Sequence, residues 1–78
     1  MQASNSDRAA LQQAGYTYEH PGYWGKNIGA YCATISADAP YVVQIMTADG
    51  SDCVYAATED FATAQDAVAH ASAWIASR

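Results

Sequence analysis

The sequence predicts an α+β fold: a three- to four-stranded antiparallel meander, one long C-terminal helix packed on one face, and a short N-terminal helix. Two observations predict this class. Residues 63–77 carry small apolar side chains at helical spacing, and the chain before them alternates short β-branched or aromatic runs with turn residues. The apolar stripe of such a helix has to be covered, and a small sheet is the element available to cover it.

The stretch from Thr63 to Ser77 (TAQDAVAHASAWIAS) has helix signals at its start and along its length. Thr63 is a favoured N-cap residue, and Asp66 complements the positive end of the helix dipole. No glycine or proline interrupts the stretch, and alanine is the best helix former. The predicted inner face consists of Ala64, Ala67, Val68, Ala71, Trp74 and Ile75.

The N-terminal part predicts a minor helix. Ser6 is expected to cap a short helix over residues 7–14, and Gly15 is expected to end it. Residues 1–5 are expected to be frayed, as chain ends often are. The whole chain, residues 1–78, is expected to form a single domain.

The middle of the chain predicts the sheet. The expected strands cover residues 16–19, 30–36, 41–47 and 53–57. Pro21-Gly22 and Asp49-Gly50 are turn signals, and residues 25–29 (GKNIG) are expected to form a loop. Tyr23 and Trp24 fit either a strand or a loop. Residues 41–47 are apolar on both faces, so the sheet face away from the helix is either solvated or a binding surface.

The charges are few and unevenly distributed. The net charge of the 78 residues is −5, and residues 27–77 contain no lysine or arginine. The acidic residues of that span are Asp38, Asp49, Asp52, Glu59, Asp60 and Asp66. Such a span projects a negative potential, and phosphate contacts need cations. Direct binding to DNA or RNA is therefore not expected.

The cysteines and the hydropathy predict a soluble, cytoplasmic protein. Cys32 and Cys53 fall on expected strands that a third strand separates, which is beyond disulfide reach, so free thiols in a reducing compartment are expected. The chain has no apolar run near the ~18 residues of a membrane span. Its first residues, MQASNSDRAALQQ, do not resemble a secretory signal.

Catalytic and metal motifs are not apparent, and neither an enzyme activity, a metal nor another cofactor is expected. His20, His70, Cys32 and Cys53 lack the close spacing of a zinc site. Residues 49–52 (DGSD) resemble part of a calcium loop but lack the bidentate glutamate that completes one. A hairpin tip is the favoured interpretation of these four residues.

The aromatic residues allow two interpretations. Six tyrosines and two tryptophans are many for 78 residues, and several of them cluster between residues 16 and 24. They either complete a small core or anchor a protein interface, where tyrosine and tryptophan are enriched. Acidic groups beside exposed aromatics would suit a basic partner surface. The candidate partner-binding residues are Tyr23, Trp24, Asp38, Asp49, Asp52, Glu59, Asp60 and Asp66.

The chain has a layout that gives it a family resemblance. A strand meander is closed by Phe-x-Thr and an alanine-rich helix that ends in tryptophan: Phe61, Thr63, Ala67, Ala71 and Trp74. In size, charge and layout it resembles small acidic phage and mobile-element proteins, among them anti-CRISPR inhibitors. These inhibitors share no common sequence signature, so the resemblance assigns no role to any residue. It implies a protein partner: a CRISPR effector, or a comparable host complex, whose lysines and arginines hold DNA or guide RNA. Carboxylates in the place of phosphates would compete for those cations.

An accessory or structural domain that forms a homodimer is the alternative. The second sheet face or the edge of the strand over residues 53–57 would provide its interface. A sheet with one helix also occurs in DNA-binding domains of transposition and integration proteins. Those domains carry lysine and arginine on the sheet face, whereas residues 30–57 of this chain contain neither.

Overall fold

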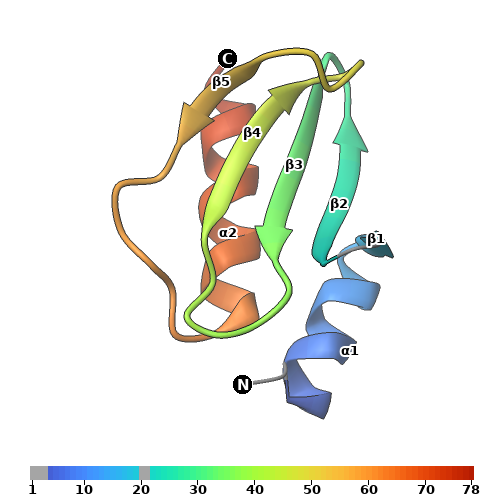
Figure 1. The fold of residues 1–78 in the computed structure, drawn as a ribbon, viewed down its shortest axis with the longest axis vertical. Helices are drawn as coiled ribbons and strands as arrows, with labels where there is room; N and C mark the ends of the chain where they lie inside the picture. The colour runs from blue at the N-terminus through green and yellow to red at the C-terminus, as the bar shows by residue number, and fades with distance from the viewer. Residues whose placement is uncertain (1–3, 20–21) are drawn as a thin grey trace.

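The computed structural model describes residues 4–19 and 22–78 and has an α+β fold (Figure 1). In chain order the elements are α1 (Asn5–Gln13), β1 (Thr17–Glu19), β2 (Tyr23–Ile28), β3 (Tyr31–Ser36), β4 (Val43–Thr47), β5 (Cys53–Ala56) and α2 (Ala64–Ala76). The predicted α+β class and antiparallel meander are confirmed, but the sheet has five strands and not the expected three or four. The expectations for residues 1–3, His20 and Pro21 lie outside the described residues.

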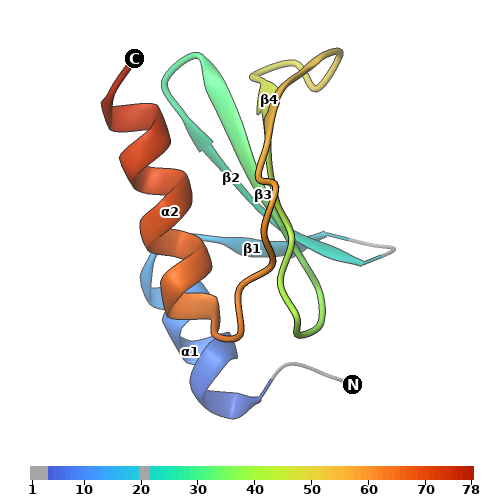
Figure 2. The same ribbon diagram turned by 90° about the vertical axis from the view of Figure 1, so that its left-hand side faces the viewer.

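The strands form one antiparallel sheet in the order β1-β2-β3-β4-β5, so each strand pairs with its neighbour in the sequence. Both helices lie on the same side of this sheet, and α1 packs beside α2 (Figure 2). No helix of residues 4–19 and 22–78 lies on the opposite side of the sheet (Figure 1). None of the described helices is long and apolar enough to cross a membrane.

The prediction of a loop over residues 25–29 is wrong. Residues 23–28 form β2, which pairs with β3 from Tyr23↔Ser36 to Ile28↔Tyr31. Glycine, lysine and asparagine have low strand propensity, but cross-strand pairing outweighs propensity in a sheet. The turn is confined to Gly29 and Ala30, and Gly29 adopts a φ of 60° that favours glycine.

The helix α1 begins earlier than predicted, because Ser4 and not Ser6 is its N-cap. The Ser4 hydroxyl accepts a hydrogen bond from the backbone N–H of Asp7 at 3.1 Å. Gly15, with a φ of 93°, follows the helix as expected. The Lys26 ammonium group donates to the Ala14 carbonyl at 2.7 Å, where a cation also complements the helix dipole.

The core lies between the sheet and α2, and the predicted inner face of α2 is confirmed. Ala64, Ala67 and Ala71 are fully buried, and the predicted N-cap Thr63 accepts a hydrogen bond from the Asp66 N–H at 3.2 Å. Val68, Trp74 and Ile75 pack at its margin. The sheet contributes alternate residues of its central strands to this core, as the period of two in a strand requires: Ala33, Ile35, Val43 and Ile45.

A partly buried hydrogen-bonded cluster joins α1 to the start of α2. The Asp7 carboxylate accepts from the Tyr41 hydroxyl at 2.7 Å and from the Ala64 N–H at 3.1 Å. Tyr41 is fully buried. Its burial, together with the bond to Asp7 and the nearby carboxylate charges, raises the pKa of Tyr41 to about 12.

Candidate protein-binding surface

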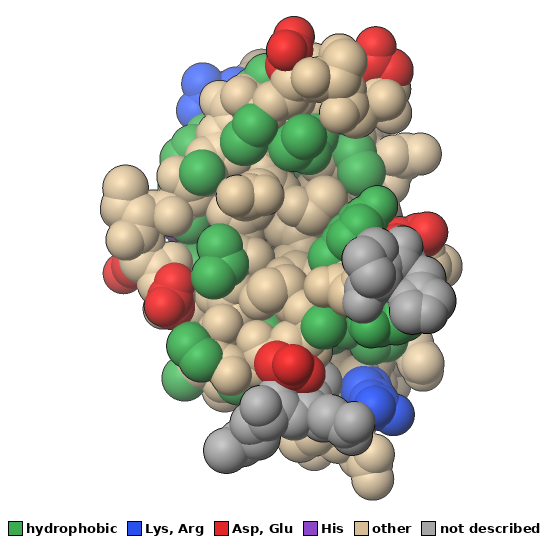
Figure 3. Space-filling view, viewed as in Figure 1, with side chains coloured by type: hydrophobic (Ala, Val, Ile, Leu, Met, Phe, Trp, Pro, Cys, Tyr) green, Lys and Arg blue, Asp and Glu red, His purple; other side chains and the backbone are tan. Residues whose placement is uncertain are grey.

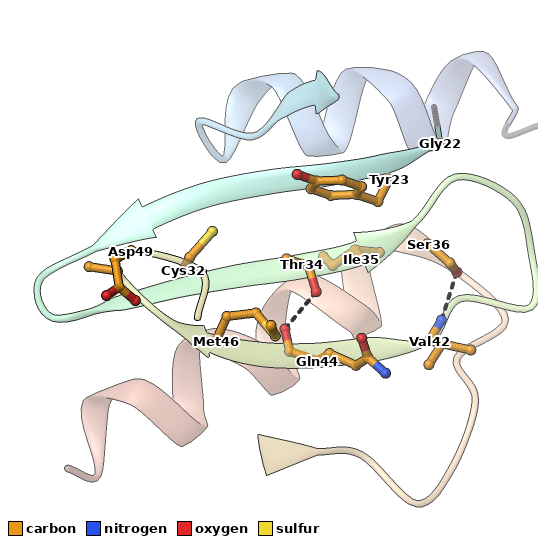
Figure 4. A pocket seen from close by; sticks show the side chains of 12 residues that line it. Gly22, Tyr23, Cys32, Thr34, Ile35, Ser36, Val42, Gln44, Met46 and Asp49 are labelled. Atoms are coloured by element: carbon orange, nitrogen blue, oxygen red, sulfur yellow. Dashed lines mark hydrogen bonds between the residues drawn. The ribbon is translucent and has the colours of Figure 1, made fainter. Parts of the chain in front are cut away.

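The open face of the sheet carries a groove of about 500 Å³ that runs over β3 (Figure 4). The outward side chains of β3 are small: Cys32, Thr34 and Ser36. The register places Cys32 opposite Met46 and Thr34 opposite Gln44, so longer side chains of β4 form one wall. We call this feature the β3 groove. The groove forms because the small side chains of the central strand β3 lie between Tyr23 of β2 and the longer side chains of β4.

Apart from Asp49 at one end, the residues that line the β3 groove are uncharged, and the hydroxyl groups of Thr34 and Ser36 hydrogen-bond to the backbone. The Thr34 hydroxyl donates to the Gln44 carbonyl at 2.9 Å, and Ser36 Oγ accepts from the Val42 N–H at 2.8 Å (Figure 4). These bonds turn the polar atoms toward the sheet. At the end of the groove near the β4–β5 turn, the lining includes the Cys32 thiol and the Met46 thioether, which are soft apolar groups.

Tyr23 forms the other wall and is 40% exposed, which agrees with its predicted place on the surface. Its ring lies against Gly25: a Cβ placed on Gly25 would lie 3.4 Å from Tyr23 Cε2 and 3.7 Å from Glu19 Cγ. The absence of a side chain at Gly25 thus lets the ring lie along β2. Glycine inside a strand often marks such a close approach.

Trp24 is not a surface anchor, so that part of the prediction is wrong. Its side chain is 5% exposed and belongs to the core, because neighbouring residues of a strand point to opposite faces. The half-exposed Tyr18 packs edge-on against it, with ring centroids 5.4 Å apart. Tyr16 is also buried. Of this aromatic group, only Tyr23 lines the β3 groove.

Five of the predicted acidic residues surround the open face. Asp49 and Asp52 lie in the β4–β5 turn, Asp38 lies in the β3–β4 connection at the other end of the groove, and Glu59 and Asp60 lie between β5 and α2. All five are exposed, and we call them the acidic rim. Charged side chains occur at the periphery of this face and not over its centre (Figure 3).

Asp66 does not belong to the acidic rim. It lies in the first turn of α2, on the helix side of the sheet, where its carboxylate complements the helix dipole. Glu19, in contrast, was not predicted and lies on the open face, because it pairs with Tyr23. Its carboxylate accepts from the Thr17 hydroxyl at 2.8 Å. Only the register of β1 and β2 places it there.

Asp49 is the most firmly positioned carboxylate of the rim. Its Oδ1 accepts from the Thr47 hydroxyl at 2.6 Å, the Ser51 N–H at 3.0 Å and the Ser51 hydroxyl at 2.8 Å. These bonds, first of all the one from Thr47, lower the pKa of Asp49 to about 2. Gly50 has a φ of 78°. The predicted hairpin tip is therefore confirmed at residues 49–52.

The ionisation of Asp49 gives a testable prediction. We expect its carboxyl carbon to titrate with a midpoint near pH 2 in an NMR pH series. Because the pKa is lower in the folded chain than the ordinary 3.8, the contribution to stability is present above pH 3.8 and is lost as the pH falls through 2. Thr47→Val, which removes the shortest bond, should move the midpoint toward 3.8. An unchanged midpoint in that variant would contradict the assignment.

In the part of the chain that the structure describes, no group of three or more His, Cys, Asp or Glu side chains is arranged to hold a metal ion. Cys32 and Cys53 are free, as expected, with Met46 between them in the sheet. His70 packs between aromatic rings, and its Nε2 lies 2.7 Å from the Tyr55 hydroxyl. The Arg78 guanidinium lies 4.2 Å from the centre of the Trp74 ring.

Comparison of the chain with protein-family models, curated proteins and solved structures finds no significant match. The geometry of the open face is therefore the basis for any functional assignment.

Proposed function

We propose that this chain is a non-catalytic inhibitor that binds a basic, nucleic-acid-binding surface of a host defence complex, such as a CRISPR effector, in the host cytoplasm. The observation that carries the proposal is the acidic rim: carboxylates from three separate connections lie around one sheet face whose centre carries no charged side chain (Figure 3). A surface that holds DNA or guide RNA presents lysine and arginine side chains, and these are complementary in charge to the rim.

The distribution of bases supports the same partner. Lys26 is the one basic residue on the described strands, and its ammonium group is bound to Ala14 on the helix side. The open face therefore has carboxylates, and also some Lys and Arg side chains, at its edge, and no charged side chain at its centre (Figure 3). Opposite charges speed association and select partners more than they add affinity, so binding should depend on ionic strength.

The proposal is tested with a purified CRISPR effector–guide RNA complex and immobilised protein. We expect binding to weaken at least tenfold between about 50 and about 200 mM salt. Two double variants should weaken it by about tenfold each: Asp49→Asn with Asp52→Asn, and Glu59→Gln with Asp60→Asn. Asp66→Asn is the matched control, since it removes one carboxylate from the helix side. An affinity that changes neither with the salt concentration nor in the two rim variants would refute the electrostatic proposal.

Self-association is the competing function, and the acidic rim argues against it. Two copies stacked on their open faces would bring rim against rim, where like charges repel. We therefore expect a monomer over a concentration series in light scattering at low salt. A stable dimer that binds no effector would instead favour a structural, dimerising domain.

A further inference from the structure

We infer that the end of the β3 groove beside Asp49 is a subsite for one long basic side chain, lysine or arginine, of the partner protein. This inference rests on the proposed function and names the contact that the partner would make. Its basis is the junction of a neutral, sulfur-lined groove with a single positioned carboxylate (Figure 4).

The groove suits the aliphatic part of such a side chain. Cys32 and Met46 are paired across β3 and β4, and both line the groove on the approach to Asp49. Lysine and arginine bury their methylene stems along apolar surface while the charged head group stays at a polar edge. Methionine adapts to different occupants because it has three rotatable bonds.

Asp49 suits the head group. All three hydrogen bonds that hold its carboxylate go to Oδ1, and Oδ2 accepts none from the part of the chain that the structure describes. Oδ2 is thus an acceptor at the groove end whose position is already determined. The carboxylate is ionised throughout the physiological range. A charge-assisted bond to a fixed acceptor avoids part of the ordering cost of binding.

A second copy of this chain is a poor occupant. Of the three basic residues of the chain, Lys26 contacts the Ala14 carbonyl and Arg78 contacts the Trp74 ring of their own chain, whereas Arg8 is exposed on α1. Insertion of Arg8 from another copy would bring together two chains that each carry a net charge of −5, which repel each other. A basic side chain of a different protein meets neither obstacle.

The test uses three capped peptides, Gly-Ser-Xaa-Ser-Gly, in which Xaa is arginine, lysine or citrulline. Citrulline keeps the shape of arginine without its charge. In NMR titrations of the full chain, we expect the arginine and lysine peptides to shift the Met46 methyl and the Cys32 and Gly50 amide signals. The citrulline peptide should leave these signals unchanged. Equal shifts with citrulline, or shifts spread evenly over all acidic residues, would overturn the subsite.

Two variants locate the contact. Asp49→Asn keeps an acceptor for Thr47 and Ser51 but removes the charge, and should weaken the arginine peptide about tenfold. Asp52→Asn removes the same charge from the same turn and should change the affinity less than about twofold. If both variants weaken binding equally, net charge and not a subsite explains it, and the inference fails. Met46→Ala should also weaken both basic peptides, with the signal dispersion reporting whether the fold is kept.

The outcomes separate this inference from the proposed function. If the rim variants weaken effector binding but Asp49→Asn and Asp52→Asn behave alike with the peptides, the function stands and the subsite is wrong. If the peptides shift the groove signals as expected and the effector does not bind, the subsite stands and the proposed partner is wrong.

Discussion

Replacing Trp24 with alanine is expected to destabilise the fold by about 3–5 kcal/mol, the usual cost of removing a large buried aromatic side chain. The total free energy of unfolding of a chain of this length is about 4–12 kcal/mol, at 0.05–0.15 kcal/mol per residue. The substitution therefore removes a large share of the stability, because Trp24 is 5% exposed and belongs to the core. Urea denaturation followed by far-UV circular dichroism measures the effect.

Two further variants identify the cause of that loss. Tyr23→Ala changes the neighbouring residue, whose side chain is 40% exposed on the opposite face, and should cost about 1 kcal/mol or less. Trp24→Phe should cost much less than Trp24→Ala, because the buried Trp24 Nε1 has no hydrogen-bond partner to lose among the described residues. A Tyr23→Ala cost equal to that of Trp24→Ala would contradict the assignment of the two residues to different faces.

Replacing Asp7 with alanine is expected to cost about 2–4 kcal/mol, although the residue looks like an ordinary first-turn acid in the sequence. The substitution removes the acceptor of both the Tyr41 hydroxyl and the Ala64 N–H. Hydrogen bonds to a charged group contribute about 1.5–3 kcal/mol each, and the fully buried Tyr41 hydroxyl would be left without its partner. Urea denaturation of the variant provides the measurement.

A double-mutant cycle tests whether the effect of Asp7 passes through Tyr41. Tyr41→Phe removes the hydroxyl and keeps the ring, and the double variant Asp7→Ala/Tyr41→Phe should be more stable than the sum of the single losses by about 1–2 kcal/mol. Asp7→Asn keeps an acceptor and should cost less than Asp7→Ala. Strict additivity of the two single losses would show that the bond does not contribute as described.

Local patterns in the sequence predict the long helix and the β4–β5 hairpin. Thr63 acts as the N-cap, and the alanine stripe with Trp74 faces the sheet as its spacing predicts. Asp49-Gly50 forms the turn. These features depend on residues three or four apart, so their signal is contained in a short window.

The errors concern features that depend on distant pairing. Residues 25–28 look like a loop until β3 pairs with them, and the alternation of Tyr23 and Trp24 has meaning only once that strand exists. The β3 groove likewise results from the registers of three strands. Ser4 and Ser6 are both good caps, and the contact of Asp7 with α2 favours the earlier one.

The division of the predicted acidic residues between the two sides of the sheet also depends on distant strand pairing. Five of them come together around one face because the connections that carry them lie at the ends and one side of the sheet, whereas Asp66 falls on the helix side. Charge counts along the chain give the sign of the potential, but only the topology assigns each carboxylate to a face.

The nearest-neighbour strand order has a kinetic consequence. Each pairing in the sheet joins adjacent segments, so it can form by closing a short loop, and chains rich in local contacts fold quickly. The Asp7 bonds, in contrast, join residues 34 and 57 positions apart. Docking of α1 must then wait until β4 and α2 are in place.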